Sequence, residues 1–461
     1  MEHERRHNRV MLDVLACALA LCLALFGVIP FVLNESSLPP LGVLSRAVMG
    51  ALVVGSLLLW GFSSRIAMRV HALSLRRIML WSSVFVLIFL LLPPIGSADL
   101  WNYVVRVREW VVAGLNPFII PSSAISHDIF FPLSPPQWHG NTLNYGPLWL
   151  LLMAPVETFA RDSLFAHLVL YRLVPAVAFL VSVWMVHHLA EQYAPSRARA
   201  VTILYAWNPL LLFEAVNNGH NDMVMVMLIL AAWLCLVRRR AFAVLPLLAA
   251  SFLVKYLSLL LIPFAIVLLW KSGRNGVARA ATIAGGGLVG VLLAIVAFSP
   301  FWEGLATLSG IVTQQGYFVV QYQSPFSFLG FLVLSSAGFG MDQALMIVSR
   351  ISVSLFALWY AWALFSGIWR GYSLGEFWFR AGLGYLLFAS FLVAPWFVVW
   401  VIPFGLLSSS RRVAWMTALL TIAAFLSYAL PFLSLLLLIA LVALFGFILY
   451  HRASHVLLHS S

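Results

Sequence analysis

Long apolar stretches separated by short polar connectors dominate the pattern of the chain. Uncharged runs such as Ile78–Leu92 and Leu433–Tyr450 recur from one end to the other, too often for the core of a globular domain. A helix that spans a bilayer needs about 20 apolar residues, whereas spanning β-strands alternate in hydropathy. The continuous runs therefore predict an all-α polytopic membrane protein, with a bundle of about twelve to fourteen transmembrane helices.

Some of the apolar stretches are interrupted or short. Gly146–Ala160 and Phe326–Ala337 predict short or re-entrant helices. Residues 201–237 predict two helices that turn at the polar sequence NNGHND. Lys255 lies near the expected outer turn of the next apolar region, and Pro395–Trp396 interrupts a later one. These breaks place polar groups where the chain reverses direction.

The distribution of charged residues predicts how the chain is oriented in the membrane. The 461 residues are 63% apolar and 9% charged, compared with roughly 25% charged residues in a soluble domain. The net charge is +12, and the basic residues form short clusters between apolar stretches, which is typical of cytoplasmic loops. We therefore predict a multi-pass protein of the plasma membrane with cytoplasmic N- and C-termini. Nucleic acid is not an expected partner, because no basic tract carries interleaved aromatic residues. The cysteines lie in apolar runs and are interpreted as core residues: Cys17, Cys22 and Cys235.

The longest segment that is neither a span nor a short connector runs from Ser97 to Trp149. Residues 99–112 have helical spacing, with polar and apolar positions on opposite faces. We expect an amphipathic helix that lies in the membrane interface and ends at Gly114, before a turn at Asn116–Pro117. The polar face holds Asp99, Asn102, Arg106 and Glu109, and the apolar face holds Leu100, Val104, Val107 and Val111.

The domain organisation follows from these segments. We expect one integral membrane domain over residues 1–461, with residues 97–146 as a first external loop and residues 301–325 as a second. The polar turns fall on the side opposite the basic clusters, so the external face is predicted to be the working face. The second loop contributes Gln314, Gln315, Gln321 and Tyr322.

Asp99 comes directly after the third predicted span and opens the predicted amphipathic helix. Aspartate is favoured as a helix N-cap, which is the structural interpretation of this residue. A catalytic role is the other interpretation. The two are compatible, because a carboxylate has more than one acceptor site.

Four motifs in the first half of the chain follow a recognisable order: SADLWNYVVRVREWVVAGLNPF, LNYGPLWLLL, WNPLLLFEAVNNGHNDMVMVMLILAAW and LVKYLSLLLIPF. They resemble the GT-C-fold glycosyltransferases that use polyprenyl-phosphate sugars, in particular the polyprenol-phosphate-mannose-dependent α-(1→6)-mannosyltransferases. In that group an aspartate after an early span opens a long external loop. A YGP-type turn closes the loop, and a GHND-type turn follows an NP-containing helix. The resemblance covers residues 90–270; beyond them only the break at APWFVVWVIPF matches.

The resemblance implies a GT-C-like bundle and the transfer, with inversion, of a hexose such as mannose from a polyprenyl-phosphate donor. By match to the family's loop aspartate, Asp99 is the expected base that takes the proton of the acceptor hydroxyl. The departing phosphate needs cations. Lys255 is our candidate, because an isolated lysine among apolar residues is costly, although it could also be a snorkelling lysine at a helix end. Arg106 and His220 are the expected helpers, and Arg106 could instead bind lipid headgroups.

The NNGHND turn allows a structural and a functional interpretation. Gly219 and its neighbours can make a tight reversal, and Asn221 or Asp222 can cap the next helix. The resemblance instead implies that His220, Asn221 and Asp222 line the sugar site. Glu157 and Glu214 lie in or beside apolar segments, so each needs a partner that the sequence does not identify. The expected substrate-binding residues are Lys255, His220, Asn221, Asp222, Tyr145, Arg106 and Tyr103.

The expected partners are a polyprenyl-phosphate-linked sugar, a glycan or glycolipid acceptor and the lipid bilayer. We expect no cofactor beyond the donor itself. No DxD or DE pair follows Asp99, so we expect no essential metal. A transporter or flippase of lipid-linked sugars is the alternative function, and a non-catalytic scaffold is a third. A transporter favours polar groups near the bilayer midplane and repeated halves, which the sequence does not show. Arabinose, glucose and aminosugar donors stay open.

Overall fold

The structure is a computed structural model that describes residues 2–32, 43–69, 73–272, 275–312, 324–390, 394–429 and 446. The described residues form helices and connecting turns without any strand. The chain divides into two compact units, residues 1–315 and 316–461. The expectation of one membrane domain stays a prediction.

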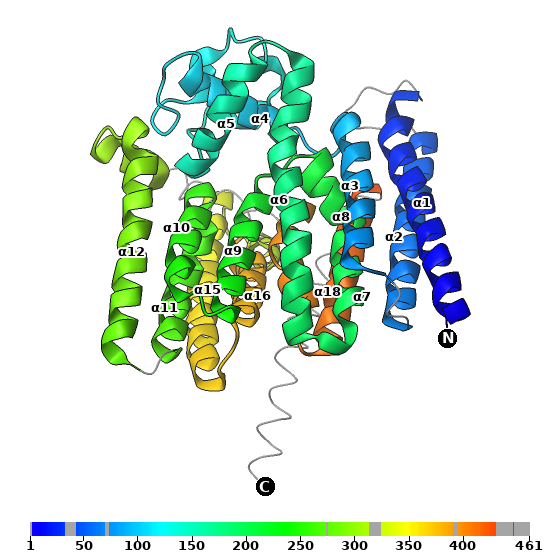
Figure 1. Cartoon of the computed structure of the whole chain (residues 1–461). Helices are drawn as coiled ribbons and strands as arrows, with labels where there is room; N and C mark the ends of the chain where they lie inside the picture. The colour runs from blue at the N-terminus through cyan, green and yellow to red at the C-terminus, as the bar shows by residue number, and fades with distance from the viewer. Residues whose placement is uncertain are drawn as a thin grey trace. The chain divides into compact units, whose positions relative to one another are not determined.

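The first unit holds the four sequence motifs and the first predicted external loop (Figure 1). Its helices are α1 (Glu2–Val32), α2 (Val43–Arg69), α3 (Leu75–Leu91), α4 (Asp99–Val111), α5 (Pro147–Ala160), α6 (Leu164–Tyr193), α7 (Ala198–Ala206), α8 (Pro209–Leu212), α9 (Asp222–Val237), α10 (Val244–Val254), α11 (Ile262–Lys271) and α12 (Gly276–Phe298). The described helices of the second unit are α14 (Pro325–Ser336), α15 (Met341–Arg370), α16 (Leu374–Gly384), α17 (Ile402–Leu406) and α18 (Arg411–Ala429).

Within the described residues, 5 helices are long and apolar enough to cross a membrane. A sixth candidate is the pair Pro209–Asn217 and Asp222–Val237, which bends by 115° at the NNGHND turn. These helices confirm an all-α polytopic membrane protein, while the count of twelve to fourteen spans stays a prediction. The long candidates are Arg6–Ile29, Ala47–Met68, Leu164–Tyr193, Gly276–Phe301 and Met341–Arg370.

Two predicted short segments are short in the structure. α5 has 14 residues and α14 has 12, so at 1.5 Å per residue neither reaches across a hydrocarbon core of about 30 Å. α5 begins with Pro147 in its first turn, where a missing N–H costs nothing. The next apolar region is broken, because α10 ends at Val254 and a 3₁₀ helix, Tyr256–Leu261, precedes α11.

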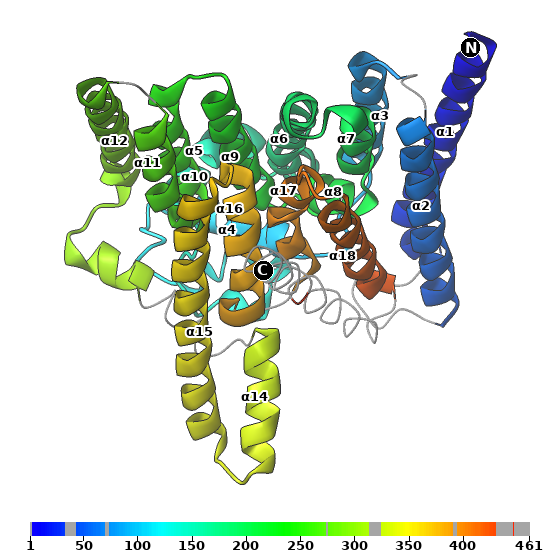
Figure 2. The same ribbon diagram turned by 90° about the horizontal axis from the view of Figure 1, so that it is seen from below.

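Helices of the first unit pack side by side in a row that Figure 2 shows from below. α6 contacts α3, α7 and α9, and α10 contacts both α9 and α12. α4 and α5 lie beyond the ends of these helices, at the top of Figure 1, and pack on each other. Outward-facing apolar side chains such as Val277 and Val296 of α12 are 78% and 66% exposed, which is typical of a lipid-facing surface.

The second unit contains the Pro395–Trp396 break. α14 packs against α15 (Figure 2), and α16 begins with a capping box between Ser373 and Glu376. Pro395 starts a 3₁₀ helix that runs to Trp400, which confirms an interruption of the apolar region. Residues 313–323 lie outside the described residues. The calls on the second external loop that fall there are Gln314, Gln315, Gln321 and Tyr322.

The predicted helix at the start of the first loop forms, but its surroundings differ from the expectation. α4 spans Asp99–Val111, close to the predicted 99–112. Its polar face is covered as well as its apolar face, and Asn102, Arg106 and Glu109 are all buried. The loop that follows folds back over this face, so the helix does not present its polar side to solvent as an interfacial helix would.

Candidate active site

The first residue of α4 is Asp99, and the N-cap position belongs to Ala98. Asp99 donates its own backbone N–H to Ser97 Oγ at 3.1 Å. The structural interpretation as N-cap is therefore not what the structure shows, and the Asp99 carboxylate is available for other contacts. Its side chain is 18% exposed.

Two asparagines of the NNGHND turn hold the segment that leads into Asp99. Asn217 Oδ1 accepts the N–H of Ile95 at 3.2 Å, and Asn218 Oδ1 accepts the N–H of Gly96 at 3.1 Å. The Asn217 side-chain amide also donates to Pro93 O at 3.0 Å. The sequence alone indicates only a reversal at these asparagines, but in the structure their side chains fix where the first loop starts.

Arg172 of α6 supports both sides of this junction from behind. Its guanidinium is buried and donates to main-chain carbonyls of Leu90 at 2.9 Å, Leu92 at 2.6 Å and Asn217 at 3.3 Å. Gly219 lies against it with φ +69°, and a Cβ there would come within 2.7 Å of Arg172 Cγ. The tight reversal predicted at Gly219 is confirmed, since only glycine adopts this conformation without strain and leaves space for the arginine.

His220 lies between two carboxylates. Its Nδ1 is 3.7 Å from Asp99 Oδ2, and its Nε2 is 3.3 Å from Glu214 Oε2. Glu214 is fully buried in a π-helical turn, Phe213–Asn217, and accepts the Asn218 amide at 2.8 Å. The partner of Glu214, unidentified from sequence, is thus the turn itself.

Lys255 occupies the break between α10 and the next 3₁₀ helix, in extended backbone conformation. Its Nζ is 2.5 Å from Asp222 Oδ1 and 6.0 Å from the centre of the Tyr145 ring. Asp222 is the first residue of α9, and Asn221 takes the N-cap position without a side-chain cap bond. The expectation of a cap by Asn221 is therefore wrong, because its side chain lies within 3.5 Å of the Tyr103 hydroxyl instead.

The YGP turn is docked directly on this break. Gly146 N–H donates to Val254 O at 3.0 Å, and the Tyr256 hydroxyl donates to Tyr145 O at 3.1 Å. The ring of Tyr145 packs edge-on against Tyr103 of α4, with 5.1 Å between centroids. The turn therefore joins the end of the first loop to Lys255 on one side and to α4 on the other.

Four distant segments thus bring most of the predicted residues together. Arg106 is the exception, since its guanidinium contacts Glu109 at 3.1 Å and the carbonyls of Trp138 and Asn141. Those contacts bind the loop to α4. They occupy the guanidinium and so count against a phosphate role for Arg106, which stays a prediction. The residues that are brought together are Asp99, Tyr103, Tyr145, His220, Asn221, Asp222 and Lys255.

Opposing effects act on the pKa of the Asp99 carboxyl group. Burial raises the pKa of Asp99 above its ordinary value, while His220 and Lys255 act to lower that pKa. Further along α4, burial raises the pKa of Glu109 to about 7 against the opposing effect of Arg106. Asp99 is therefore a partly shielded carboxylate with a raised pKa beside the two basic side chains of His220 and Lys255. Such a group is suited to proton transfer.

Glu157, the other glutamate of uncertain role, belongs to a separate network that locks the loop. Its carboxylate lies 2.8 Å from the Arg108 guanidinium of α4. It also lies 2.8 Å from the His167 ring and 2.7 Å from the Tyr171 hydroxyl, both on α6. Arg108 also contacts Asp128 in the loop at 2.7 Å. The glutamate therefore has partners as expected, and they are structural.

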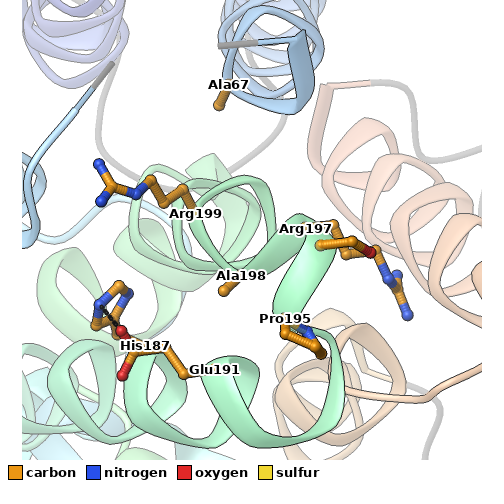
Figure 3. Close-up of a pocket in the computed structure, with 8 residues that line it drawn as sticks. Ala67, His187, Glu191, Pro195, Arg197, Ala198 and Arg199 are labelled. Carbon is orange, nitrogen blue, oxygen red and sulfur yellow. Dashed lines mark ion pairs between the residues drawn. The ribbon is translucent and has the colours of Figure 1, made fainter. Parts of the chain in front are cut away.

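A cavity of about 230 Å³ lies at the far end of α6 from this loop (Figure 3). His187 Nε2 lies 3.3 Å from Glu191 Oε1 there, and the Arg197 and Arg199 side chains point apart. None of the predicted site residues lines it. The lining residues are Ala67, His187, Glu191, Pro195, Ser196, Arg197, Ala198 and Arg199.

Comparison with known proteins identifies the family. Residues 14–271, more than half of the chain, match the family described as alpha-(1→6)-mannopyranosyltransferase, N-terminal domain. The chain belongs to this family. All four motifs and all the predicted site residues lie inside the matched range, so the resemblance noted from sequence is confirmed.

Individual members of the alpha-(1→6)-mannopyranosyltransferase family are distant relatives. A protein of Mycolicibacterium smegmatis named "Probable alpha-(1→6)-mannopyranosyltransferase" is 26% identical over 363 residues, 70% of this chain and 63% of the relative. An alpha-(1→6)-mannopyranosyltransferase of Mycobacterium tuberculosis is 30% identical over 149 residues, 32% of this chain and 25% of the relative. One of Corynebacterium glutamicum is 24% identical over 187 residues, 41% and 37% of the two chains. The chain therefore spans less than two thirds of the length of these relatives.

Proposed function

We propose that the protein transfers mannose, with inversion, from a polyprenyl-phosphate donor to a lipid-linked or cell-envelope glycan acceptor on the external face of the membrane. Family membership supports the sugar and the reaction class. The observation that carries the proposal is a difference in exposure. The side chains of Asp99 and Lys255 are 18% and 16% exposed, whereas His220 and Asp222 behind them are 2% exposed.

Asp99 and Lys255, the two partly exposed groups, have different roles in the proposed reaction. The acceptor hydroxyl attacks the anomeric carbon, and Asp99 takes its proton as the new C–O bond forms. The bond from the anomeric carbon to the phosphate oxygen breaks, and the polyprenyl monophosphate leaves. Lys255, held by Asp222, faces the negative charge that develops on that phosphate.

The orientation of the site is part of the proposal. Arg197 and Arg199 follow the C-terminal end of α6, on the far side from the loop that starts at Asp99. Under the positive-inside rule, this separation supports a cytoplasmic position for the arginines and an external position for the loop.

The test is transfer of labelled sugar by the purified protein from a panel of polyprenyl-phosphate mannose, glucose, arabinose and aminosugar donors. We expect transfer of mannose that Asp99→Asn abolishes while donor binding persists. Lys255→Met should raise the KM for the donor, whereas Lys271→Met, at the end of α11, should leave it unchanged.

Near wild-type turnover of Asp99→Asn would remove Asp99 as the base. An unchanged donor KM in Lys255→Met would contradict the phosphate role. Movement of a lipid-linked sugar across liposomes without any transfer would support a transporter instead.

A further inference from the structure

Glu214 is a buried acid that the proposed reaction does not use. It lies in the π-helical turn between α8 and α9, where Asn218 N–H donates to Phe213 O and His220 N–H donates to Glu214 O. Such a turn adds a residue to the helix, and π-helical turns are frequent at functional sites. In this turn the Glu214 carboxylate lies beside Nε2 of His220, six positions later.

The three side chains Asp99, His220 and Glu214 form a short series that runs from the partly exposed Asp99 to the fully buried Glu214. Glu214 Oε2 is 3.3 Å from His220 Nε2, and His220 Nδ1 is 3.7 Å from Asp99 Oδ2. The Asn218 amide donates to the same Glu214 oxygen at 2.8 Å. An imidazole with one carboxylate facing each nitrogen is stabilised as the doubly protonated cation.

Other charged groups face this series from each neighbouring element. Asp222 of α9 acts on both Asp99 and His220, and Lys255 acts on Asp99 from the break after α10. Arg172 of α6 lies under Gly219 and directs its guanidinium to main-chain carbonyls. Lys255 is paired with Asp222, whereas His220, once protonated, faces the Asp99 carboxylate and has the buried Glu214 as its own counter-ion.

We propose that Glu214 and His220 are positioning residues that keep Asp99 ionised and oriented as the base. This inference rests on the proposed function. Without a neighbouring cation, a largely shielded carboxylate retains its proton and cannot accept another. The proton that Asp99 takes from the acceptor hydroxyl leaves from Asp99 to water, because His220 and Glu214 are closed to solvent. The pair therefore sets the charge of the base without relaying its proton.

The test is the pH dependence of kcat/KM for mannose transfer in Glu214→Gln. The glutamine keeps the shape of the side chain and an oxygen for Asn218 but removes the charge that stabilises the imidazolium. It also removes the direct repulsion between Glu214 and Asp99, which is smaller than the attraction between His220 and Asp99, so loss of the imidazolium decides the direction of the shift. Activity falls at low pH as Asp99 gains its proton. We expect this acidic limb to move to higher pH by about one unit, the lower end of the effect of an opposite charge at this range. Well above the limb, the rate should stay within a few-fold of wild type.

Glu157→Gln is the matched control, since Glu157 is also buried and faces His167 Nε2 at 2.8 Å, away from Asp99. We expect it to leave the position of the limb unchanged even if it lowers stability. His220→Gln should shift the limb in the same direction as Glu214→Gln, and the double variant should add little to His220→Gln. If Glu214→Gln does not fold, the His220→Gln profile decides.

The possible results distinguish a failure of the role of Glu214 and His220 from a failure of the proposed function. An active wild type with unshifted limbs in Glu214→Gln and His220→Gln would overturn this inference and leave the proposed function intact. A wild type that transfers sugar from no donor would remove the proposed function, and this inference with it.

Discussion

The close approach of the YGP turn to the break at Lys255 predicts a strong effect of one added methyl group. Gly146 has φ −75° and ψ 159°, a conformation open to any residue, so only space requires glycine there. A Cβ on Gly146 would lie 2.1 Å from the carbonyl oxygen of Leu253. Main-chain atoms form this contact, so no flexible side chain can turn away from the methyl group.

The size of the disturbance follows from this distance. A carbon and an oxygen atom that are not bonded to each other come no closer than about 3.3 Å without strain. Gly146→Ala therefore forces the two backbones apart by roughly 1 Å. Overpacking of this kind costs about 1–3 kcal/mol of stability. The shift also moves Tyr145 away from Lys255, and a misplacement of roughly 1 Å at a reacting centre can cost up to about 100-fold in rate. We expect kcat to fall by about 10–100-fold, or about 1.4–2.7 kcal/mol in activation free energy.

The assay compares mannose transfer per folded molecule in Gly146→Ala and Gly140→Ala. Gly140 lies in the same loop, and a Cβ there would meet nothing within 4 Å. Gly140→Ala should keep the wild-type rate and thermal midpoint, which separates the steric effect from a general effect of alanine. Wild-type transfer and thermal stability in Gly146→Ala would contradict this prediction and show that the turn does not control the position of Lys255.

Two further predictions concern stability. Arg172→Met leaves buried carbonyls at the end of α3 without their donor, at about 1–3 kcal/mol each, so the thermal midpoint should fall sharply; a wild-type midpoint would contradict this role. Burial raises the pKa of Glu109 from 4.5 to about 7, so the stability present below pH 4.5 is lost as pH rises through 7. The thermal midpoint of wild type should fall between pH 5 and 8, and Glu109→Gln should flatten that slope; an equally steep slope in this variant would contradict the assignment.

The sequence predicted the features whose signals are local. The helix predicted at residues 99–112, the reversal at Gly219 and the turn expected near Lys255 follow from spacing, from a glycine and from the short apolar segments on either side. The length of α5 followed in the same way from the short apolar run. Each of these depends on residues within about one turn of one another, which a single sequence displays.

The environment of α4 could not be predicted in this way. Its polar face has a helical period whether water or protein covers it. In the structure Arg106 contacts carbonyls more than 30 positions later in the loop, and Arg108 contacts Glu157. Pairing at such separations depends on how the loop folds back, which periodicity does not record. The roles of Asn217 and Asn218 were missed for the same reason, since their partners lie 122 positions away.

Arg172 and Lys255 show where the isolated-charge signal stops being informative. Each is a single basic residue in an apolar stretch, and the reasoning that singled out Lys255 applies equally to Arg172. Their partners and exposure separate them. Arg172 is 1% exposed and bonds carbonyls of α3 and of the NNGHND turn, so its charge joins the segments behind Asp99. Lys255 pairs with a carboxylate and keeps 16% of its side chain exposed at the opening. A lone cation among apolar residues is therefore an ambiguous signal, and only its partners and exposure separate the structural role of Arg172 from the phosphate-facing role that we propose for Lys255.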